Sequence, residues 1–482
     1  MRSNKEFLLT VYEKAEKGKA KRASRRYALT AVTSLLLAVC MLAGTAVYFK
    51  NELTPDADTP VINGVDNPTL GTEKPTAGIV PPEIYDDSLK IDGVEVSSGS
   101  ITQNLLDGLQ SENVKVSYAL EHLFDGSSDF AFDMLAKTYE GENVFISPYS
   151  IIAALAMTAN GADGETRAEI ESAVGLTVDE MNELIMSYNH RCEYLNSANS
   201  FWMRNGSFTV KPDFLINLDA YYDAGVFAAP FDDGTLDDIN KWVSDNTDGM
   251  IPEALTEIPK DVVAYIINTL LFAGKWEDPY YDGKNTTMTF TSSDGTEAEG
   301  EFMHGESALL ELDYATGICK DYSRELSFVA LLPNEGCTIE DVISSLDSDS
   351  IAEAMKTGRK TRHSRCAAES LPKFKSETSL ELSDALKETG IISAFDLRAD
   401  FSRITDSIEL FVSQVIHKTA FEIDEEGSRA AAATIVEFTE ESEEEFIHEP
   451  EKVPVIFDRP FVYMIVNSYG FPIFIGVCDS IK

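Results

Sequence analysis

The fold assignment rests on one segment, Glu425-Glu426-Gly427-Ser428-Arg429-Ala430-Ala431-Ala432-Ala433-Thr434-Ile435-Val436. One interpretation is a helix that begins at Ser428, because serine is a preferred N-cap and four alanines follow it. The other is a strand, because residues 428, 430, 432, 434 and 436 are all small or apolar, whereas Arg429 and Glu437 fall on the opposite parity. Successive side chains of a strand point to opposite faces, so this alternation is typical of a strand with one buried face. The local sequence leaves both interpretations open.

Around this segment the hydrophobic periodicity is steady from about Val114 to the end of the chain, which indicates a single domain, 114–482. The stretches with helical spacing are Phe130–Tyr139, Ile151–Thr158, Thr166–Val174 and Leu236–Asp245. The stretches that predict strands are Val263–Phe272, Leu326–Leu332, Ile408–Phe421, Pro460–Asn467 and Pro472–Cys478. Helices that come first and β-rich sequence that comes later predict an α+β fold rather than a βαβ repeat.

The N-terminal part of the chain predicts a membrane anchor. Residues 1–26 carry nine Lys/Arg and three Glu, a net charge of +6, and the 23 residues of 27–49 contain no charged side chain. A helix of that length is about 35 Å long, which is enough to cross a hydrocarbon core of roughly 30 Å. Basic flanks favour the cytoplasmic side, so we expect 1–26 to be cytoplasmic, 27–49 to be a transmembrane signal-anchor and the rest to be extracytoplasmic.

Two alternatives to a permanent anchor stay open. Gly44-Thr45-Ala46 could be cleaved as a signal-peptide site, which would make the protein secreted, and Cys40 could carry a lipid. Residues 50–113 follow, with six prolines between positions 51 and 88 among Thr, Asp and Gly, and this composition predicts an extended linker. A basic start, a single anchor and an acidic exterior are typical of a bacterial cell-surface protein.

Composition and motif searches exclude several function classes. The net charge of −43 argues against nucleic acid as a partner. The sequence has no Gly-x-Ser-x-Gly, no GxxxxGK[ST], no HExxH and no GxGxxG motif. Its six histidines are far apart, and its cysteines form no CxxC pair, so we predict no metal site, no cofactor and no disulfide framework. We therefore expect a protein that is not an enzyme.

A series of short motifs runs through the predicted domain. The first are Asn143-Val144-Phe145-Ile146-Ser147-Pro148-Tyr149-Ser150-Ile151, Gly161-Ala162-x-Gly164-x-Thr166 and Ala198-Asn199-Ser200-Phe201-Trp202. Next come Ile239-Asn240-x-Trp242-Val243, Asn268-x-Leu270-x-Phe272-x-Gly274-x-Trp276 and Leu371-Pro372-Lys373-Phe374. The last are His417-Lys418-Thr419 and Phe457-Asp458-Arg459-Pro460-Phe461. Each motif alone is weak, but the ordered set from about Val114 to Lys482 resembles the serpin family of serine protease inhibitors.

The resemblance implies a serpin fold with three β-sheets, about nine helices and an exposed reactive-centre loop, here at about 425–456. The implied function is suicide-substrate inhibition: a serine protease cleaves the loop, is trapped as an acyl-enzyme, and the cut loop enters the central sheet as a new strand. In this context 425–436 is expected to be a strand, and the protein a monomer. The alternatives are a non-inhibitory serpin, acting as a cell-surface binding or chaperone module, and a surface protein with a sacrificial cleavage site.

The resemblance also implies roles for particular residues. The hinge of the loop comprises Glu425, Glu426, Gly427, Ser428, Ala430, Ala432 and Thr434. Gly427 is expected to supply backbone freedom, and the small residues after it to face the core during insertion. The residues that match the shutter, a polar cluster that holds the sheet closed or open, are Ser147, Ser150, Asn268 and His417. Trp276 matches the breach, where the loop first enters. The structural alternative for the shutter residues is a satisfied buried network, and the alternative for Trp276 is ordinary core packing.

The scissile bond is predicted from the family's usual loop length. Counting from Glu425 places the cleavage between Glu441 and Ser442, which suits a glutamyl-specific protease. A shift of register would offer Thr439 to an elastase-like protease, or Phe438 to a chymotrypsin- or subtilisin-like protease. The sequence departs from the family because its loop is longer, and the surplus lies in the acidic run 443–449. Such a flank should favour a protease with a basic rim and make association sensitive to salt.

Overall fold

The computed structural model describes residues 94–96, 102–106, 120–192, 194–206, 208–260, 262–322, 325–407, 409–429 and 449–481. The predicted cytoplasmic segment 1–26 and the predicted anchor 27–49 lie outside these ranges. Within them, no helix combines the length and the apolar character that a bilayer crossing requires.

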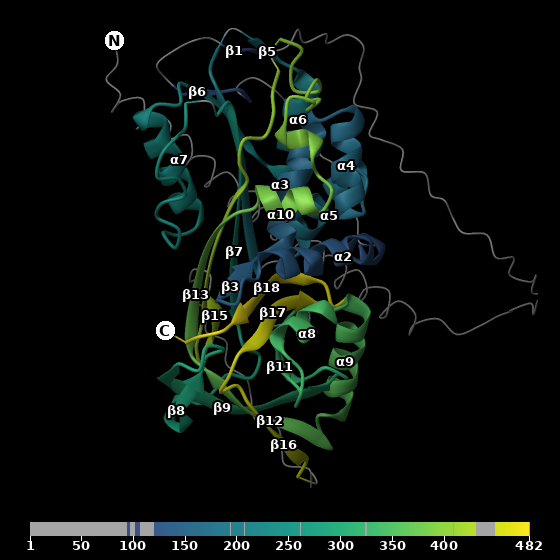
Figure 1. Ribbon diagram of the computed structural model, residues 1–482, viewed down its shortest axis with the longest axis vertical. Coiled ribbons are helices and arrows are strands. Elements are labelled where there is room, and N and C mark those ends of the chain that lie inside the picture. The colour runs from purple at the N-terminus through teal and green to yellow at the C-terminus, as the bar shows by residue number, and fades with distance from the viewer. Residues whose placement is uncertain are drawn as a thin grey trace, which may run out of the picture. The chain divides into compact units, whose positions relative to one another are not determined.

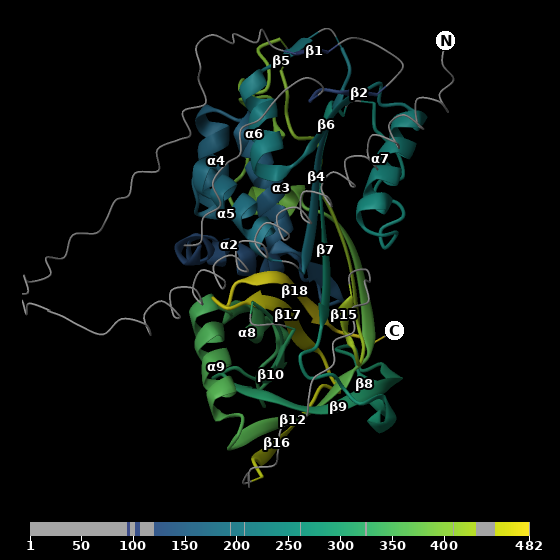
Figure 2. The ribbon, with the colours of Figure 1, turned by 180° about the vertical axis from the view of Figure 1, so that it is seen from behind.

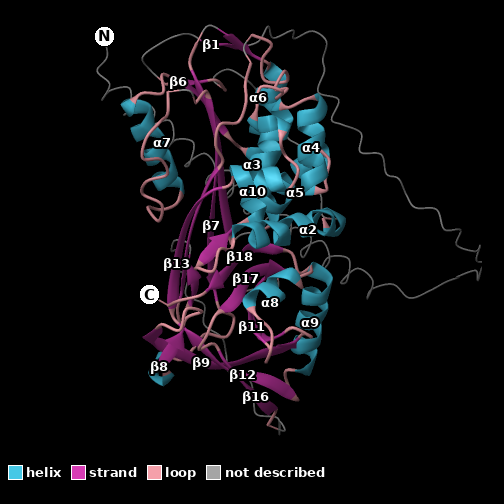
Figure 3. Cartoon of the chain, in the orientation of Figure 1, coloured by secondary structure: helices cyan, strands magenta, loops and turns pink. Residues whose placement is uncertain are grey.

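Nine α-helices lie in the described part of the chain, as the resemblance implied (Figure 3). They are α2 (Glu121–Thr138), α3 (Pro148–Gly161), α4 (Gly164–Val174), α5 (Val178–Arg191), α6 (Pro212–Tyr222), α7 (Asp233–Asn246), α8 (Ile339–Ser344), α9 (Ser348–Thr361) and α10 (Ser383–Glu388). Two short 3-10 helices, η1 (Asp282–Lys284) and η2 (Ser393–Phe395), accompany them. The four stretches with helical spacing coincide with parts of α2, α3, α4 and α7, apart from Tyr139, which follows the last residue of α2, so these predictions are confirmed.

The described strands form three sheets, and the α+β fold with three sheets is confirmed. The seven-stranded sheet has the order β13 (Phe374–Glu381), β14 (Ile416–Ile423), β15 (Gly427–Arg429), β7 (Ala264–Lys275), β4 (Leu195–Arg204), β6 (Gly225–Ala229) and β2 (Gln103–Asn104). The nine-stranded sheet has the order β16 (Glu451–Ile456), β12 (Arg365–Pro372), β9 (Glu297–Glu311), β10 (Ala315–Asp321), β11 (Leu326–Pro333), β17 (Phe461–Asn467), β18 (Pro472–Cys478) and β3 (Val144–Ile146), with β8 (Thr286–Thr291) beside β9. The two-stranded sheet pairs β1 (Val94–Val96) with β5 (Phe208–Val210).

Helices cover both faces of the seven-stranded sheet. In Figures 1 and 2, α7 lies on one side of the long strands, and the group α2–α6 lies on the other. The side chain of Asp232 caps α7 by accepting a hydrogen bond from Thr235 N–H, and the helix buries Ile239 and Val243. Ile239 belongs to a small apolar cluster with Trp202 and Tyr265 from the sheet, and Trp242 of the same helix packs against that cluster. The main core fills the opposite side, so α7 is a separately packed cover over β4, β6 and β7.

One predicted strand is too long. The stretch Ile408–Phe421 is apolar and β-branched enough to predict a strand throughout, but β14 begins only at Ile416. The preceding residues bond elsewhere: Val412 N–H donates to the carbonyl of Ala394 at 2.8 Å, and Leu382 N–H donates to the carbonyl of Val415 at 2.8 Å. This part of the chain therefore connects η2 and α10 to the sheet rather than extending its ladder.

Part of the predicted linker 50–113 belongs to the folded domain. Strand β2 pairs with β6 at the edge of the seven-stranded sheet, with Gln103 opposite Ala228. Leu105 N–H donates to the carbonyl of Val226 at 2.9 Å, and the Leu105 side chain is 1% exposed. Thr102 Oγ1 donates to Asp238 Oδ2 of α7 at 3.0 Å. The isolated segment gives no periodic signal because only a few of its residues are used for docking.

We predict that Leu105→Ala destabilises the domain by about 2–5 kcal/mol, because it removes a fully buried side chain from a close-packed core. The measurement is the free energy of unfolding in guanidinium for the full chain. Leu106→Ala is the matched control, since Leu106 is only half-buried. Equal, small effects of both substitutions would mean that 102–106 behaves as linker.

Candidate functional site

The segment on which the fold assignment rests begins as a strand. A tight turn at Asp424–Glu426 joins β14 to β15, and Asp424 N–H donates to the carbonyl of Gly427 at 2.9 Å. Strand β15 then lies between two neighbours, with Ser428 opposite Ile423 of β14 and opposite Gly274 of β7. The helix interpretation is therefore wrong for Gly427–Arg429. The remaining predicted hinge residues Ala430, Ala432 and Thr434 lie outside the described residues, as do Phe438, Thr439, Glu441 and Ser442.

Ser428 is the first hinge residue whose side chain is predicted to face inward, and it points into the core. Ser428 is 1% exposed, and its Oγ accepts a hydrogen bond from the hydroxyl of Tyr322 at 2.5 Å. Tyr322 is itself buried and stacks on Trp276 with ring centroids 4.4 Å apart. The rings of Tyr322 and Trp276 therefore leave room at position 428 only for a small side chain, and the Tyr322 hydroxyl favours a polar one.

In this structure a steric requirement accounts for Gly427, and its predicted backbone freedom at the hinge stays a prediction. Its φ is not among the positive values of the described residues, so left-handed backbone freedom is not what the position requires. A Cβ atom on Gly427 would lie 2.1 Å from the carbonyl oxygen of Gly274 and 2.9 Å from the Cα of Lys275. Glycine is needed because β15 and β7 approach each other too closely for any side chain.

An ion pair holds the start of the hinge. Lys373 Nζ lies 3.0 Å from Glu425 Oε1, and Asn285 donates a short hydrogen bond to the same carboxylate oxygen. Burial would raise the pKa of Glu425, but its hydrogen bonds and the nearby charge of Lys373 hold this pKa below its usual value. The neighbouring Glu426 is exposed. The carboxylate of Glu425 therefore fixes the turn to Asn285 and to Lys373, the residue between β12 and β13.

Trp276, the predicted breach residue, lies directly under the turn. Its indole Nε1–H donates to the carbonyl of Asp424 at 2.9 Å, and its backbone N–H donates to the carbonyl of Glu426 at 3.0 Å. Tyr280 N–H donates to the carbonyl of Glu425 at 3.0 Å. All three carbonyl groups of the turn are thus held from below. Because Trp276 is also buried among aromatic rings, it both packs in the core and contacts the hinge.

The four predicted shutter residues are brought together from three elements. His417 Nε2 of β14 accepts a hydrogen bond from Ser147 N–H at 3.0 Å. Ser150 of α3 donates a short hydrogen bond to Asn268 Oδ1 of β7, and Ser150 N–H donates to Ser147 Oγ at 3.1 Å. The start of α3 therefore contacts both β14 and β7.

The sequence analysis missed one member of this cluster. Asn268 Nδ2 donates to Asn199 Oδ1 of β4 at 2.6 Å, and Asn199 is 1% exposed. Asn199 stands in one of the motifs used for the family resemblance, but a motif match alone does not reveal which side chain it meets. The polar network thus continues from α3 through β7 to β4.

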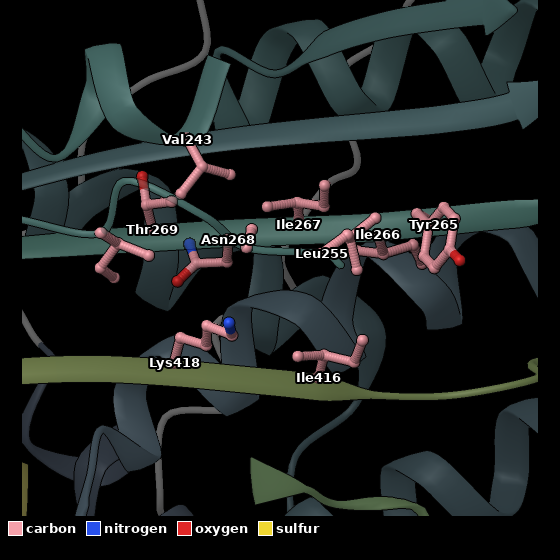
Figure 4. A pocket seen from close by; sticks show the side chains of 11 residues that line it. Val243, Leu255, Tyr265, Ile266, Ile267, Asn268, Thr269, Ile416 and Lys418 are labelled. Carbon is pink, nitrogen blue, oxygen red and sulfur yellow. The ribbon is translucent and has the colours of Figure 1, made fainter. Parts of the chain in front are cut away.

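Between β14 and β7 the sheet is not continuous. In the described residues, β14 pairs with β13 and β15, and β7 pairs with β15 and β4, but no register joins β14 to β7. A small cavity of about 40 Å³ lies at this position. Its lining includes Ile416 and Lys418 of β14, which lie across from Asn268 of β7 in Figure 4, and Val243 of α7. The gap is therefore bounded by both strands and covered by α7.

We predict that Gly427→Ala displaces β15 from β7, because the added methyl group would overlap the Gly274 carbonyl. Hydrogen–deuterium exchange should become faster at the amides of 427–429 and at the Trp276 amide, which donates to the Glu426 carbonyl. Gly234→Ala is the control, since the nearest atom to a Cβ there is the Asp232 Oδ1, 3.3 Å away. Unchanged protection of the Trp276 amide in Gly427→Ala would contradict the steric role.

We predict that His417 makes the domain sensitive to acid. Burial lowers its pKa from 6.5 to about 4, because the charged imidazolium is disfavoured away from water. The unfolded chain therefore binds the proton more readily, so this contribution is fully present above pH 6.5 and is lost as the pH falls towards 4. The loss should be on the order of 3 kcal/mol. The measurement is the pH dependence of unfolding of wild type and His417→Asn; parallel curves would contradict it.

Comparisons with known proteins agree with this architecture. Residues 125–480 match the family model described as Serpin (serine protease inhibitor). An uncharacterized serpin-like protein of Methanosarcina acetivorans is 31% identical over 376 residues, which cover 70% of this chain and 83% of that protein. Neuroserpin of Homo sapiens is 28% identical over 394 residues, which cover 74% and 90% of the two chains.

Solved structures give the same result. The crystal structure of the thermophilic serpin tengpin in the native state matches with a TM-score of 0.70 and 34% identity, covering 79% of this chain and 99% of tengpin. The latent state of tengpin matches with a TM-score of 0.63 and 32% identity, covering 77% and 100%. An interrupted seven-stranded sheet with a hinge strand at one end of the gap, together with these matches, leads to one conclusion: the chain belongs to the serpin family of serine protease inhibitors.

Proposed function

We propose that this protein inhibits a serine protease by offering the segment 425–456 for cleavage and then inserting it between β14 and β7. The observation that carries the proposal is the position of β15. Three residues of the segment already lie between these two strands, and the described residues contain no pairing between β14 and β7 beyond them. Backbone groups along both strands can therefore bond to a longer inserted strand.

The register of β15 predicts where the inserted residues would lie. Ser428 pairs with Gly274 and Ile423, and six residues farther along the antiparallel ladders are Thr434, Asn268 and His417. Insertion would therefore bring Thr434 to two shutter residues at once. Ala430 and Ala432 share the parity of Ser428, so they would face the same buried side, where small side chains cost the least rearrangement. The better match to the native than to the latent state of tengpin supports a resting state that is similar to the native one.

The target protease is proposed from the sequence of the loop. We propose Glu441-Ser442 as the scissile bond, which suits a glutamyl-specific protease, with Thr439 for an elastase-like and Phe438 for a subtilisin-like protease as alternatives. The acidic run that follows supports a target with a basic rim around its active site. These positions lie outside the described residues, so the loop sequence alone supports the assignment.

The location of the protein is likewise a proposal. A basic segment followed by 23 uncharged residues supports an anchor in the cell membrane of a bacterium, with the serpin domain outside the cytoplasm. Secretion after signal cleavage is the alternative. In either case the inhibitor would meet proteases outside the cell, where its strongly acidic composition keeps it soluble.

The function is tested by mixing the full-length chain, purified in mild detergent, with glutamyl-specific, elastase-like and subtilisin-like proteases, followed by denaturing gels. A covalent complex with one of them is expected. Mass spectrometry of the released C-terminal fragment then identifies the scissile bond. Cleavage without a complex would indicate a substrate, and no reaction at all would favour a non-inhibitory binding or chaperone module.

We predict that Ser428→Arg converts the inhibitor into a substrate. A buried arginine without a partner costs several kcal/mol, so the yield of complex should fall by about tenfold or more while cleavage continues. Glu426→Arg is the matched control, because the Glu426 side chain is exposed on the turn that leads into β15. If Ser428→Arg formed as much complex as wild type, the loop would not insert with the side chain of residue 428 on the buried face.

A further inference from the structure

Two buried residues of opposite charge lie behind the hinge. Lys320 of β10 is 5% exposed and Glu369 of β12 is 2% exposed. Glu369 is the strongest opposite charge that acts on the Lys320 ammonium. Lysine and glutamate are rarely buried to this extent unless they are paired, because removing each charge from water costs several kcal/mol. Neither residue belongs to the hinge, shutter or breach positions predicted from the sequence.

The pair is connected to the hinge through two aromatic rings. Lys320 Nζ lies 4.3 Å from the ring centroid of Tyr280 and 5.8 Å from that of Trp276. These are the residues whose N–H groups hold the carbonyl groups of the turn at Asp424–Glu426. A cation over an aromatic face is attracted by it, so the position of Lys320 influences where both rings lie.

The polar groups around the pair are incompletely satisfied. Ser307 Oγ donates to Glu369 Oε2 at 3.0 Å, and the Tyr280 hydroxyl lies beside the Glu369 carboxylate without a hydrogen bond of ordinary geometry. Gly305 of β9 leaves the space for this contact, since a Cβ there would lie 2.8 Å from Tyr280 Cε1 and 2.9 Å from Glu369 Oε1. Burial is the main cause that raises the pKa of Glu369, and its contacts with Lys320, Ser307 and Tyr280 oppose that effect.

We propose that Lys320 and Glu369 form a proton-responsive support for the hinge. While both are charged, the pair keeps the rings of Tyr280 and Trp276 under the turn. When Glu369 gains a proton, the Lys320 ammonium is left buried without its counter-charge and moves towards solvent, and the turn loosens. Acid would then release the loop hinge through a site distinct from the shutter histidine.

The electrostatics of the neighbourhood agree with this direction. Burial raises the pKa of Glu369, against the opposing effect of Lys320, and burial lowers the pKa of Lys320. The other charged groups that act on Lys320 are Asp278, Arg362 and Asp321. Arg362 and Asp278 form an ion pair at 2.8 Å, and Asp321 pairs with Arg359 at 2.6 Å. Both acids are thus engaged with arginines, which leaves Glu369 as the counter-charge that a proton can remove.

The test is hydrogen–deuterium exchange of the full chain at neutral and mildly acidic pH, corrected for the intrinsic pH dependence of exchange. In wild type, protection of the Trp276 and Tyr280 amides should fall by roughly tenfold on acidification. Glu369→Gln should lose that protection already at neutral pH and show no further change. The Asp163 amide, which donates to the Asp400 carbonyl at 2.9 Å, is the remote control.

A second variant separates the proposal from simple damage to the core. Lys320→Met in the Glu369→Gln background removes both charges and should restore protection of the two amides at both pH values, since no buried charge is then left without a counter-charge. Wild-type protection and wild-type pH dependence in Glu369→Gln would overturn the proposal. So would a double variant no better protected than Glu369→Gln.

This readout needs no protease, so it can fail independently of the proposed inhibition. The consequence for inhibition does rest on the proposed function: Glu369→Gln at neutral pH should form the protease complex with the rate that wild type shows in mild acid. A protein that forms no complex but shows the predicted exchange pattern would retain the hinge support and lose only the inhibitory role.

Discussion

The described structure is organised around two strands that are neighbours without being paired. Strands β14 and β7 share one short partner, β15, at one end, and beyond it their registers do not meet in the described residues. Backbone N–H and C=O groups strongly favour hydrogen-bonded partners, and an open strand edge readily accepts another strand. In the proposed mechanism, a continuous inserted strand would satisfy both edges and so gain free energy. The contacts at the hinge and at the shutter residues would then control the insertion.

At the hinge end, close packing limits what can enter. Gly427 passes so near the Gly274 carbonyl that no side chain fits, and Ser428 turns inward onto Tyr322. At the other end, Ser147 and Ser150 reach His417 and Asn268, so the start of α3 holds both edges at a defined separation. In the proposed insertion, small side chains on one face would therefore enter most easily, and opening would require the polar cluster to rearrange.

The hinge turn is supported from behind as well as from its flanks. Trp276 and Tyr280 hold its carbonyl groups, and Lys320 lies against both rings with Glu369 as its counter-charge. On its other side, the turn is held by the ion pair between Glu425 and Lys373. The aromatic rings pack against one another under the turn, and the two groups of opposite charges lie beside them.

The sequence determined the class of fold, the helices whose apolar spacing is regular, the C-terminal strands, and the family, because each of these depends on periodicity or on ordered motifs along the chain. The local sequence left helix and strand open at Gly427–Arg429, and only the family resemblance favoured the strand, since that choice depends on hydrogen bonds to β14 and β7. The sequence also extended β14 too far, because residues 408–415 include several apolar side chains, although Val412 and Val415 bond to other parts of the chain. The steric reason for Gly427, the contribution of Asn199 and the pairing of Lys320 with Glu369 were decided only by tertiary structure. Each of them depends on distances between strands that are far apart in sequence, and a linear pattern does not contain those distances.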